Sequence, residues 1–321
     1  MRTATSSPSR ARTLPAELAA VAALAATSAC STAVSDTAST TATGKVASSR
    51  TIHVVAAENF WGSIATQLGG SHVDVKSIIN NPNADPHDYE PTAADSRTVA
   101  TAEYAIVNGI GYDAWADRLL SASPTIGRTD LKVGDLVGIK AGGNPHRWYS
   151  PVNVHQVIER ITADYKKIDP ADAAYFDARK TEFETQALTP YNKLIADIKA
   201  KYGSSPIGAS ESIVTPLAEG LGLKMLTPES FLDAISEGTD PTAKDKATIE
   251  AQIKAKAIKI YVYNTQNSTP DVQAQVRAAK AQGIPVATVT ETLTPPAASF
   301  QAWQTRQLLG IEKALEEATG R

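Results

Sequence analysis

Two histidines in this chain directly follow a proline in a polar loop. They are His87, in the segment NADPHDYEPT, and His146, in the segment NPHRWYS. An imidazole that binds a metal ion must be held at a fixed distance and angle, and the fixed φ of the preceding proline removes one backbone freedom. One such pair arises easily by chance, whereas two in a chain with 5 histidines predict a metal site.

The remaining histidines have simpler interpretations. His53 lies inside a predicted strand, His72 follows two glycines in a predicted turn, and His155 lies on the surface pattern of a predicted helix. We expect each of these three to be structural or to face the solvent.

Strands and helices alternate along the chain from Thr51 onward. The apolar patterns predict strands at 51–57, 73–79, 105–108, 206–209, 259–263 and 286–289. Helical patterns cover 60–68, 91–101, 212–221, 270–282 and 300–317. This alternation predicts an α/β fold with parallel-type sheets flanked by helices. Ligands of such folds bind at loops beyond the carboxyl ends of the strands.

The segment 170–202 has a different character and separates the two α/β halves. Apolar side chains recur there at steps of three and four residues between 176 and 198, which is helical spacing. A continuous helix of this length would extend roughly 50 Å at 1.5 Å per residue, and Pro190 should kink or split it. We therefore expect a long central helix that joins an N-terminal lobe, 51–169, to a C-terminal lobe, 203–321.

The N-terminal residues are typical of a secretory signal. Residues 1–29 carry three arginines and then a nine-residue apolar run, 18–26, which is shorter than the roughly 17–25 residues of a membrane-spanning helix. Cys30, the only cysteine of the chain, follows directly. The stretch after it, to residue 50, is rich in Ser, Thr and Ala and is expected to be a disordered tether.

Composition excludes several classes of protein. The 321 residues hold 31 Lys and Arg against 34 Asp and Glu, so no basic excess favours nucleic acid as a partner. Hydrophobic residues make up 42%, which is typical of a folded protein and excludes general disorder. The His-Glu-x-x-His, Gly-x-Ser-x-Gly and Gly-x-Gly-x-x-Gly motifs are absent.

Taken together, the segments NADPHDYEPTAAD and NPHRWYSPVNV, the central helix and the second α/β lobe resemble one known family. It comprises the metal-binding substrate-binding lipoproteins of zinc, manganese and iron ABC importers (cluster A-I, solute-binding protein family 9). The resemblance covers the chain from Thr51 onward. Asn144 and Ser150 stand where many members carry Asp.

The resemblance implies a set of four metal ligands, which are His87, His146, Glu211 and Glu291. Glu211 matches a position after the first strand of the second lobe, and Glu291 matches a usual Asp after the last strand. A polar run at 264–267 offers another candidate for the fourth ligand. Because Asn and Gln are weak metal ligands, we expect Asn264 and Gln266 to support the ligands.

Two imidazoles and two carboxylates would give the site a charge of −2, which a divalent cation neutralises. Such nitrogen and oxygen donors suit a zinc or manganese ion, with iron(II) as the alternative. Zinc-restricted members of the family often carry a histidine-rich loop, and this chain has no histidine between His87 and His146. With two ligands from each lobe, the ion would lie in the cleft between the lobes.

The family also implies a location and partners. Cys30 resembles a lipobox cysteine, although Thr27 stands where the pattern prefers Leu, so we expect a monomer anchored by lipid on the extracytoplasmic face of the cell membrane. Its partners would be an ABC permease and its ATPase. A secreted metallohydrolase and a metal-dependent surface adhesin remain as alternatives. A catalytic metal needs an open position for water, usually beside three protein ligands, and the expected set of four argues against an enzyme.

Overall fold

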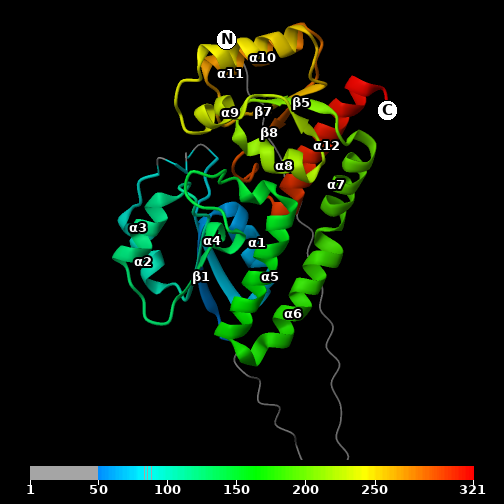
Figure 1. Ribbon diagram of the computed structural model, residues 1–321. Helices are drawn as coiled ribbons and strands as arrows, with labels where there is room; N and C mark the ends of the chain where they lie inside the picture. The colour runs from blue at the N-terminus through cyan, green and yellow to red at the C-terminus, as the bar shows by residue number, and fades with distance from the viewer. Residues whose placement is uncertain (1–49, 83, 85, 88) are drawn as a thin grey trace, which may run out of the picture. The chain divides into compact units, whose positions relative to one another are not determined.

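Two parallel sheets of four strands each form the frame of the protein (Figure 1). The computed structural model describes residues 50–82, 84, 86–87 and 89–321, which all lie within one compact unit, Ser48–Arg321. The predicted signal peptide at 1–29, the predicted lipidation site Cys30 and the predicted tether up to residue 49 lie outside the described residues.

The N-terminal lobe is built on a sheet with the strand order β2-β1-β3-β4. Its strands are β1 (Ile52–Glu58), β2 (Val73–Ile79), β3 (Tyr104–Val107) and β4 (Thr129–Lys132). Its helices are α1 (Asn59–Gly69), α2 (Ala93–Thr101), α3 (Ala114–Ala122), α4 (Val133–Val137) and α5 (Pro151–Ile168). Short 3-10 turns lie at Gly70–His72 and Arg147–Tyr149.

The C-terminal lobe repeats this topology with the order β6-β5-β7-β8. Its strands are β5 (Pro206–Ala209), β6 (Lys224–Met225), β7 (Ile260–Asn264) and β8 (Val286–Val289). Its helices are α8 (Thr215–Gly220), α9 (Glu229–Ser236), α10 (Ala243–Lys254), α11 (Pro270–Ala281) and α12 (Phe300–Thr319). The predicted helix at 212–221 begins as a 3-10 turn, Ser212–Val214, before α8.

Apolar runs explain why these segments form buried central strands. All four residues of β3 are buried, and β1 is buried at every position except His53. Strands buried on both faces are typical of parallel sheets covered by helices. At the carboxyl ends of the central strands the chain changes to buried polar residues, among them Glu58, Asn108 and Asn264. This edge of each sheet is therefore where polar side chains are held for a function.

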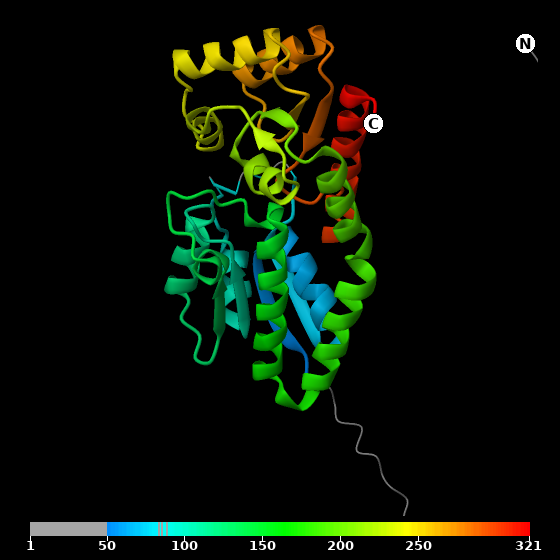
Figure 2. The same cartoon turned by 45° about the vertical axis from the view of Figure 1, so that its right-hand side comes forward.

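The segment between the lobes is helical but not a single regular helix. After a 3-10 turn at Pro170–Asp172 it consists of α6 (Ala173–Glu182), a wider π-helical turn (Phe183–Ala187) and α7 (Thr189–Tyr202). Pro190 lies in the first turn of α7, where its missing N–H costs no hydrogen bond. In both views α6 runs beside α5, and α7 runs beside α12 (Figures 1 and 2).

The sequence patterns gave no bounds for several elements that the structure contains, which are β4, β6, α3, α4, α5, α9 and α10. Strand β4 is short and only Leu131 is buried in it, so its sequence TDLK has almost no apolar signal. Helix α5 begins at Pro151, where the Ser150 hydroxyl accepts a hydrogen bond from the Asn153 N–H. A helix around His155 was predicted without bounds, and the structure shows it as α5, 18 residues long with seven buried residues.

Large aromatic side chains fill the core. All four tryptophans are at most 1% exposed. The Phe60 and Trp148 rings are stacked with their centroids 4.0 Å apart, so α1 packs directly on the segment that follows His146. Among the described residues, no helix is both long enough and apolar enough to span a membrane.

Candidate metal centre

His146 is fully buried, and the residues around it orient its ring. The Nδ1 atom lies 3.0 Å from the Asn144 Oδ1, which also accepts a hydrogen bond from the His146 backbone N–H at 3.0 Å. Because an amide oxygen can only accept, the Nδ1 atom carries the proton and Nε2 presents its lone pair. Nε2 is buried and has no hydrogen-bond partner among the described residues. Asn144 thus provides the hydrogen bonds that orient the His146 ring.

The electrostatic surroundings keep this imidazole neutral. Burial lowers the pKa of His146 well below its usual value, and the neighbouring His87 and Arg147 lower it further. A neutral imidazole is the form that binds a metal ion. His146 is therefore in its ligand form over a wider pH range than an exposed histidine.

Glu291 lies in the loop after β8 and is held from both lobes. Its Oε2 accepts a hydrogen bond from the Tyr112 hydroxyl at 2.9 Å, and its Oε1 accepts one from the Asn264 side-chain amide at 3.1 Å. Tyr112 belongs to the N-terminal lobe and Asn264 ends β7 in the C-terminal lobe. The carboxylate therefore has a fixed position between the lobes.

Glu211 follows β5 and is fully buried. Its Oε1 accepts a hydrogen bond of 2.7 Å from the same Asn264 amide that contacts Glu291. Glu211 is the residue before the 3-10 turn that starts at Ser212, yet its side chain makes no capping hydrogen bond. A role as a simple helix-start carboxylate is therefore not what its geometry indicates.

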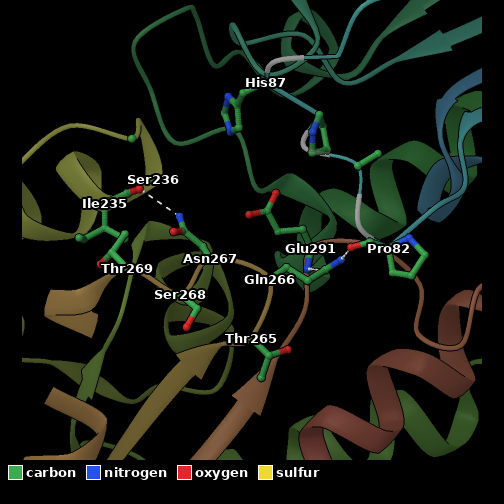
Figure 3. Close-up of a pocket in the computed structure, with 13 residues that line it drawn as sticks. Pro82, His87, Ile235, Ser236, Thr265, Gln266, Asn267, Ser268, Thr269 and Glu291 are labelled. Atoms are coloured by element: carbon green, nitrogen blue, oxygen red, sulfur yellow. Dashed lines mark hydrogen bonds between the residues drawn. The ribbon is translucent and has the colours of Figure 1, made fainter. Parts of the chain in front are cut away.

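Three of the four predicted ligands come together directly. His87, His146 and Glu291 each offer one ligand atom, and these atoms lie within 4.8 Å of one another. Glu211 is outside this group and is connected to it through Asn264. Figure 3 shows His87 and Glu291 on the wall of a cavity of about 500 Å³, with the Glu291 carboxylate pointing toward the histidine side.

Gln266 connects the loops on either side of the cavity. Its Oε1 accepts hydrogen bonds from the Glu291 and Thr292 N–H groups, at 2.5 and 3.0 Å. Its Nε2 donates to the Thr292 hydroxyl and to the Pro82 carbonyl in the N-terminal lobe (Figure 3). Gln266 therefore fixes the backbone of Glu291 and joins it to the segment that leads to His87.

Tyr112 is a functional residue that the sequence analysis did not identify. It lies after Gly109-Ile110-Gly111, three consecutive residues with φ of 75°, 64° and 91°. Glycine tolerates such values, whereas a β-branched isoleucine is strained there. The turn brings the Tyr112 ring to 4.7 Å from the His87 ring. The sequence did carry one signal for this turn, because Gly109 and Gly111 directly follow the predicted strand at 105–108.

A pair of buried carboxyl groups lies beneath this loop. Asp113 accepts hydrogen bonds from the Asn108 and Gly109 N–H groups, both at 2.7 Å, and Asn108 in turn donates to the Pro145 carbonyl beside His146. Burial raises the pKa of Glu58 well above its usual value, and the adjacent Asp113 raises it further. Burial also raises the pKa of Asp113, to about 6. The two shifts favour a protonated Glu58 beside an Asp113 that ionises above about pH 6.

The sequence matches one known protein family and several curated metal-binding proteins. Residues 54–314 match the family described as ZnuA, zinc-uptake complex component A, periplasmic. The manganese-binding lipoprotein MntA of Halalkalibacterium halodurans is 28% identical over 155 residues, which are 46% of this chain and 49% of MntA. The manganese ABC transporter substrate-binding lipoprotein PsaA of Streptococcus mitis is 24% identical over 250 residues, 71% of this chain and 78% of PsaA. The chain thus spans about half the length of MntA and 78% of the length of PsaA.

Solved structures show the same fold. A manganese-bound periplasmic metal-binding protein from Candidatus Liberibacter asiaticus, with an S38A substitution, superposes with a TM-score of 0.70. It is 20% identical in sequence, and the match covers 83% of this chain and 99% of that protein. The prediction of two α/β lobes with parallel sheets is confirmed by this likeness and by the strand order.

Proposed function

Because this chain belongs to the ZnuA family, the metal-binding solute-binding proteins of manganese, zinc and iron ABC importers, we propose that it captures a divalent transition-metal ion between its two lobes. In this proposal His87, His146, Glu211 and Glu291 are the ligands of the ion. The chain delivers the ion to an ABC permease driven by an ATPase. A solute-binding protein is not an enzyme, so the metallohydrolase alternative is excluded.

One observation carries the proposal. The ligand atoms of His87, His146 and Glu291 lie within 4.8 Å of one another, and the buried Nε2 of His146 has no hydrogen-bond partner among the described residues. An unpartnered buried nitrogen costs free energy unless something binds it. Neutral imidazole and carboxylate are donors that zinc, manganese and iron(II) accept.

The proposed cargo is a zinc or manganese ion, with iron(II) as the alternative. Two carboxylates and two neutral imidazoles favour none of the three strongly, and affinity in vitro follows the Irving–Williams order, which ranks zinc above manganese. Asn264 and Gln266 hold the carboxylate side of the site through hydrogen bonds. Family membership supports an extracytoplasmic location, and we propose that a lipid on Cys30 anchors the chain there.

The proposal is tested by equilibrium dialysis of the metal-free full chain against Zn²⁺, Mn²⁺ and Fe²⁺, with the bound metal measured by mass spectrometry. We expect His146→Gln and Glu291→Gln to lose tight binding of all three ions while circular dichroism is unchanged. His155→Gln is the matched control because this histidine is partly exposed on α5, away from the cavity. Wild-type affinity in both variants would contradict the proposed ligands, and no binding by the wild type would contradict the function.

A further inference from the structure

A second group of candidate ligands lies in the N-terminal lobe, outside the cavity between the lobes. His72 ends the 3-10 turn after α1, whereas Asp169 precedes and Asp172 ends the 3-10 turn that joins α5 to α6. One nitrogen of His72 and one carboxylate oxygen from each aspartate lie within 4.8 Å of one another. Segments almost 100 residues apart in the sequence therefore meet at these three side chains.

The contact between His72 and Asp172 does not have the geometry of a hydrogen bond. The Nδ1 atom of His72 lies 2.8 Å from Asp172 Oδ2, yet this buried nitrogen makes no hydrogen bond within the described part of the chain. The two atoms are thus close without pointing at each other. At bond lengths of about 2.1 Å, ligand atoms 2.8 Å apart subtend roughly 84° at an ion, which is the angle between adjacent octahedral ligands.

The two aspartates occupy helix-capping positions but do not cap a helix. Asp169 precedes the 3-10 turn and Asp172 precedes α6, positions where Asp usually accepts a hydrogen bond from the backbone of the helix. Neither side chain makes such a capping bond. Instead both carboxylates lie near His72, so their placement is not explained by helix capping.

Among the described residues, no lysine or arginine pairs with the carboxylates of this group, and His72 alone pairs with Asp172. Asp169 is only 7% exposed, and its carboxylate has no hydrogen bond or ion pair with any residue that the structure describes. The one ion-pair partner of Asp172 within the same residues is His72. Two carboxylates held close together, one of them on a residue that is only 7% exposed, are stabilised when a cation lies between them.

The histidine ring is held in place from its other side. It stacks on the Tyr175 ring with centroids 3.9 Å apart and meets the Phe176 ring edge-on at 5.9 Å. The Tyr175 hydroxyl also accepts a hydrogen bond from the Ser71 N–H at 3.1 Å. A ligand whose ring is fixed by packing loses little entropy when it binds an ion.

We propose that His72, Asp169 and Asp172 form a second site for a divalent transition-metal ion, separate from the proposed cargo site. One imidazole and two carboxylates bind the ion, and water fills its remaining positions because Asp172 is 31% exposed. The ion ties the turn after α1 to the corner between α5 and α6. Its role is to stabilise the lobe, since neither corner takes part in the cavity between the lobes.

The test measures free Mn²⁺ by its electron paramagnetic resonance signal in the presence of the full chain. The bound Mn²⁺ is the total minus the free ion. Mn²⁺ is chosen because it prefers oxygen and imidazole ligands to the thiol of Cys30. We expect two equivalents for the wild type, one for Asp172→Asn, one for His146→Gln and none for the double variant. Asp74→Asn is the matched control, because Asp74 lies 3.6 Å from His53 in a pair that has no third ligand.

The outcomes separate this site from the proposed cargo site. If His146→Gln still binds two equivalents while Asp172→Asn binds one, the second site stands and the cargo site is wrong. If the wild type binds one equivalent and His146→Gln removes it, the second site is wrong. His72→Gln serves as a second variant in case Asp172→Asn disturbs folding, and two equivalents in both variants would overturn the proposal.

Discussion

The buried pair of Glu58 and Asp113 makes the stability of the metal-free protein depend on pH in a specific direction. The folded-state pKa of Glu58 lies well above its unfolded value near 4.3, so the folded chain retains a proton that the unfolded chain loses. A raised folded pKa contributes stability that is fully present below the unfolded pKa and is lost as pH rises through the folded pKa. The pair therefore destabilises the protein progressively from about pH 4.3 upward.

The magnitude follows from proton linkage. One extra proton in the folded state lowers the free energy of unfolding by about 1.4 kcal/mol for each pH unit over which Glu58 is protonated in the folded chain and ionised in the unfolded chain. The Glu58→Gln substitution removes the titrating carboxyl group, and the glutamine amide can still donate a hydrogen bond to the ionised Asp113. Near pH 5 we expect the free energy of unfolding of the variant to equal that of the wild type within about 1 kcal/mol. At pH 7 we expect the variant to be more stable by about 1–3 kcal/mol.

Urea unfolding of the metal-free wild type and variant between pH 4.5 and pH 8 measures this difference. Glu250→Gln is the control because Glu250 is an exposed glutamate on α10. If the difference in unfolding free energy between Glu58→Gln and the wild type does not change with pH, the reasoning is refuted. It would mean that the two carboxyl groups do not share a proton in the folded state.

Three further results are expected. Replacing Asn264 by Leu removes the amide that donates to Glu211 and Glu291, so metal affinity in dialysis should fall about 10- to 100-fold, as is usual for residues that orient ligands. The pKa of His146 is lowered, so His146 should release no proton when Mn²⁺ binds between pH 5.5 and 7.5, and a two-proton slope of log affinity against pH would contradict the buried neutral imidazole. Truncating Trp148 to Ala should cost about 3–5 kcal/mol in urea unfolding because its ring is fully buried, and a loss under 1 kcal/mol would contradict its packing.

Much of the fold could be predicted because its central strands carry a strong apolar signal. The pattern at 51–57 corresponds to β1, which is buried at six of its seven positions, and the pattern at 73–79 corresponds to β2, whose first five residues alternate between partly buried and exposed. Strand β4 was missed because its stability comes from parallel pairing with β3 and not from its own apolar residues. Propensity is a weak guide where tertiary pairing determines the structure.

The site was predictable to a different extent at each position. His87 and His146 carry a local signal in the preceding proline, whereas Glu211 and Glu291 were found only through resemblance to the family. Tyr112 could not be found by either route, because its role depends on a hydrogen bond to a residue 179 positions away. Contacts of this kind arise from the packing of two lobes, which a local pattern does not encode.

The arrangement of polar contacts also bears on how the site would respond to an ion. Each loop that carries a proposed ligand is already joined to the opposite lobe: Tyr112 donates to Glu291, Gln266 donates to Pro82, and the Asn144 amide donates to the Ser212 carbonyl at 2.7 Å. An ion entering such a site does not have to order these loops, so little of its binding free energy is lost to conformational entropy. It has only to compete with the Tyr112 and Asn264 hydrogen bonds on the carboxylates. We therefore expect small local shifts on binding and not a wide closing motion of the lobes.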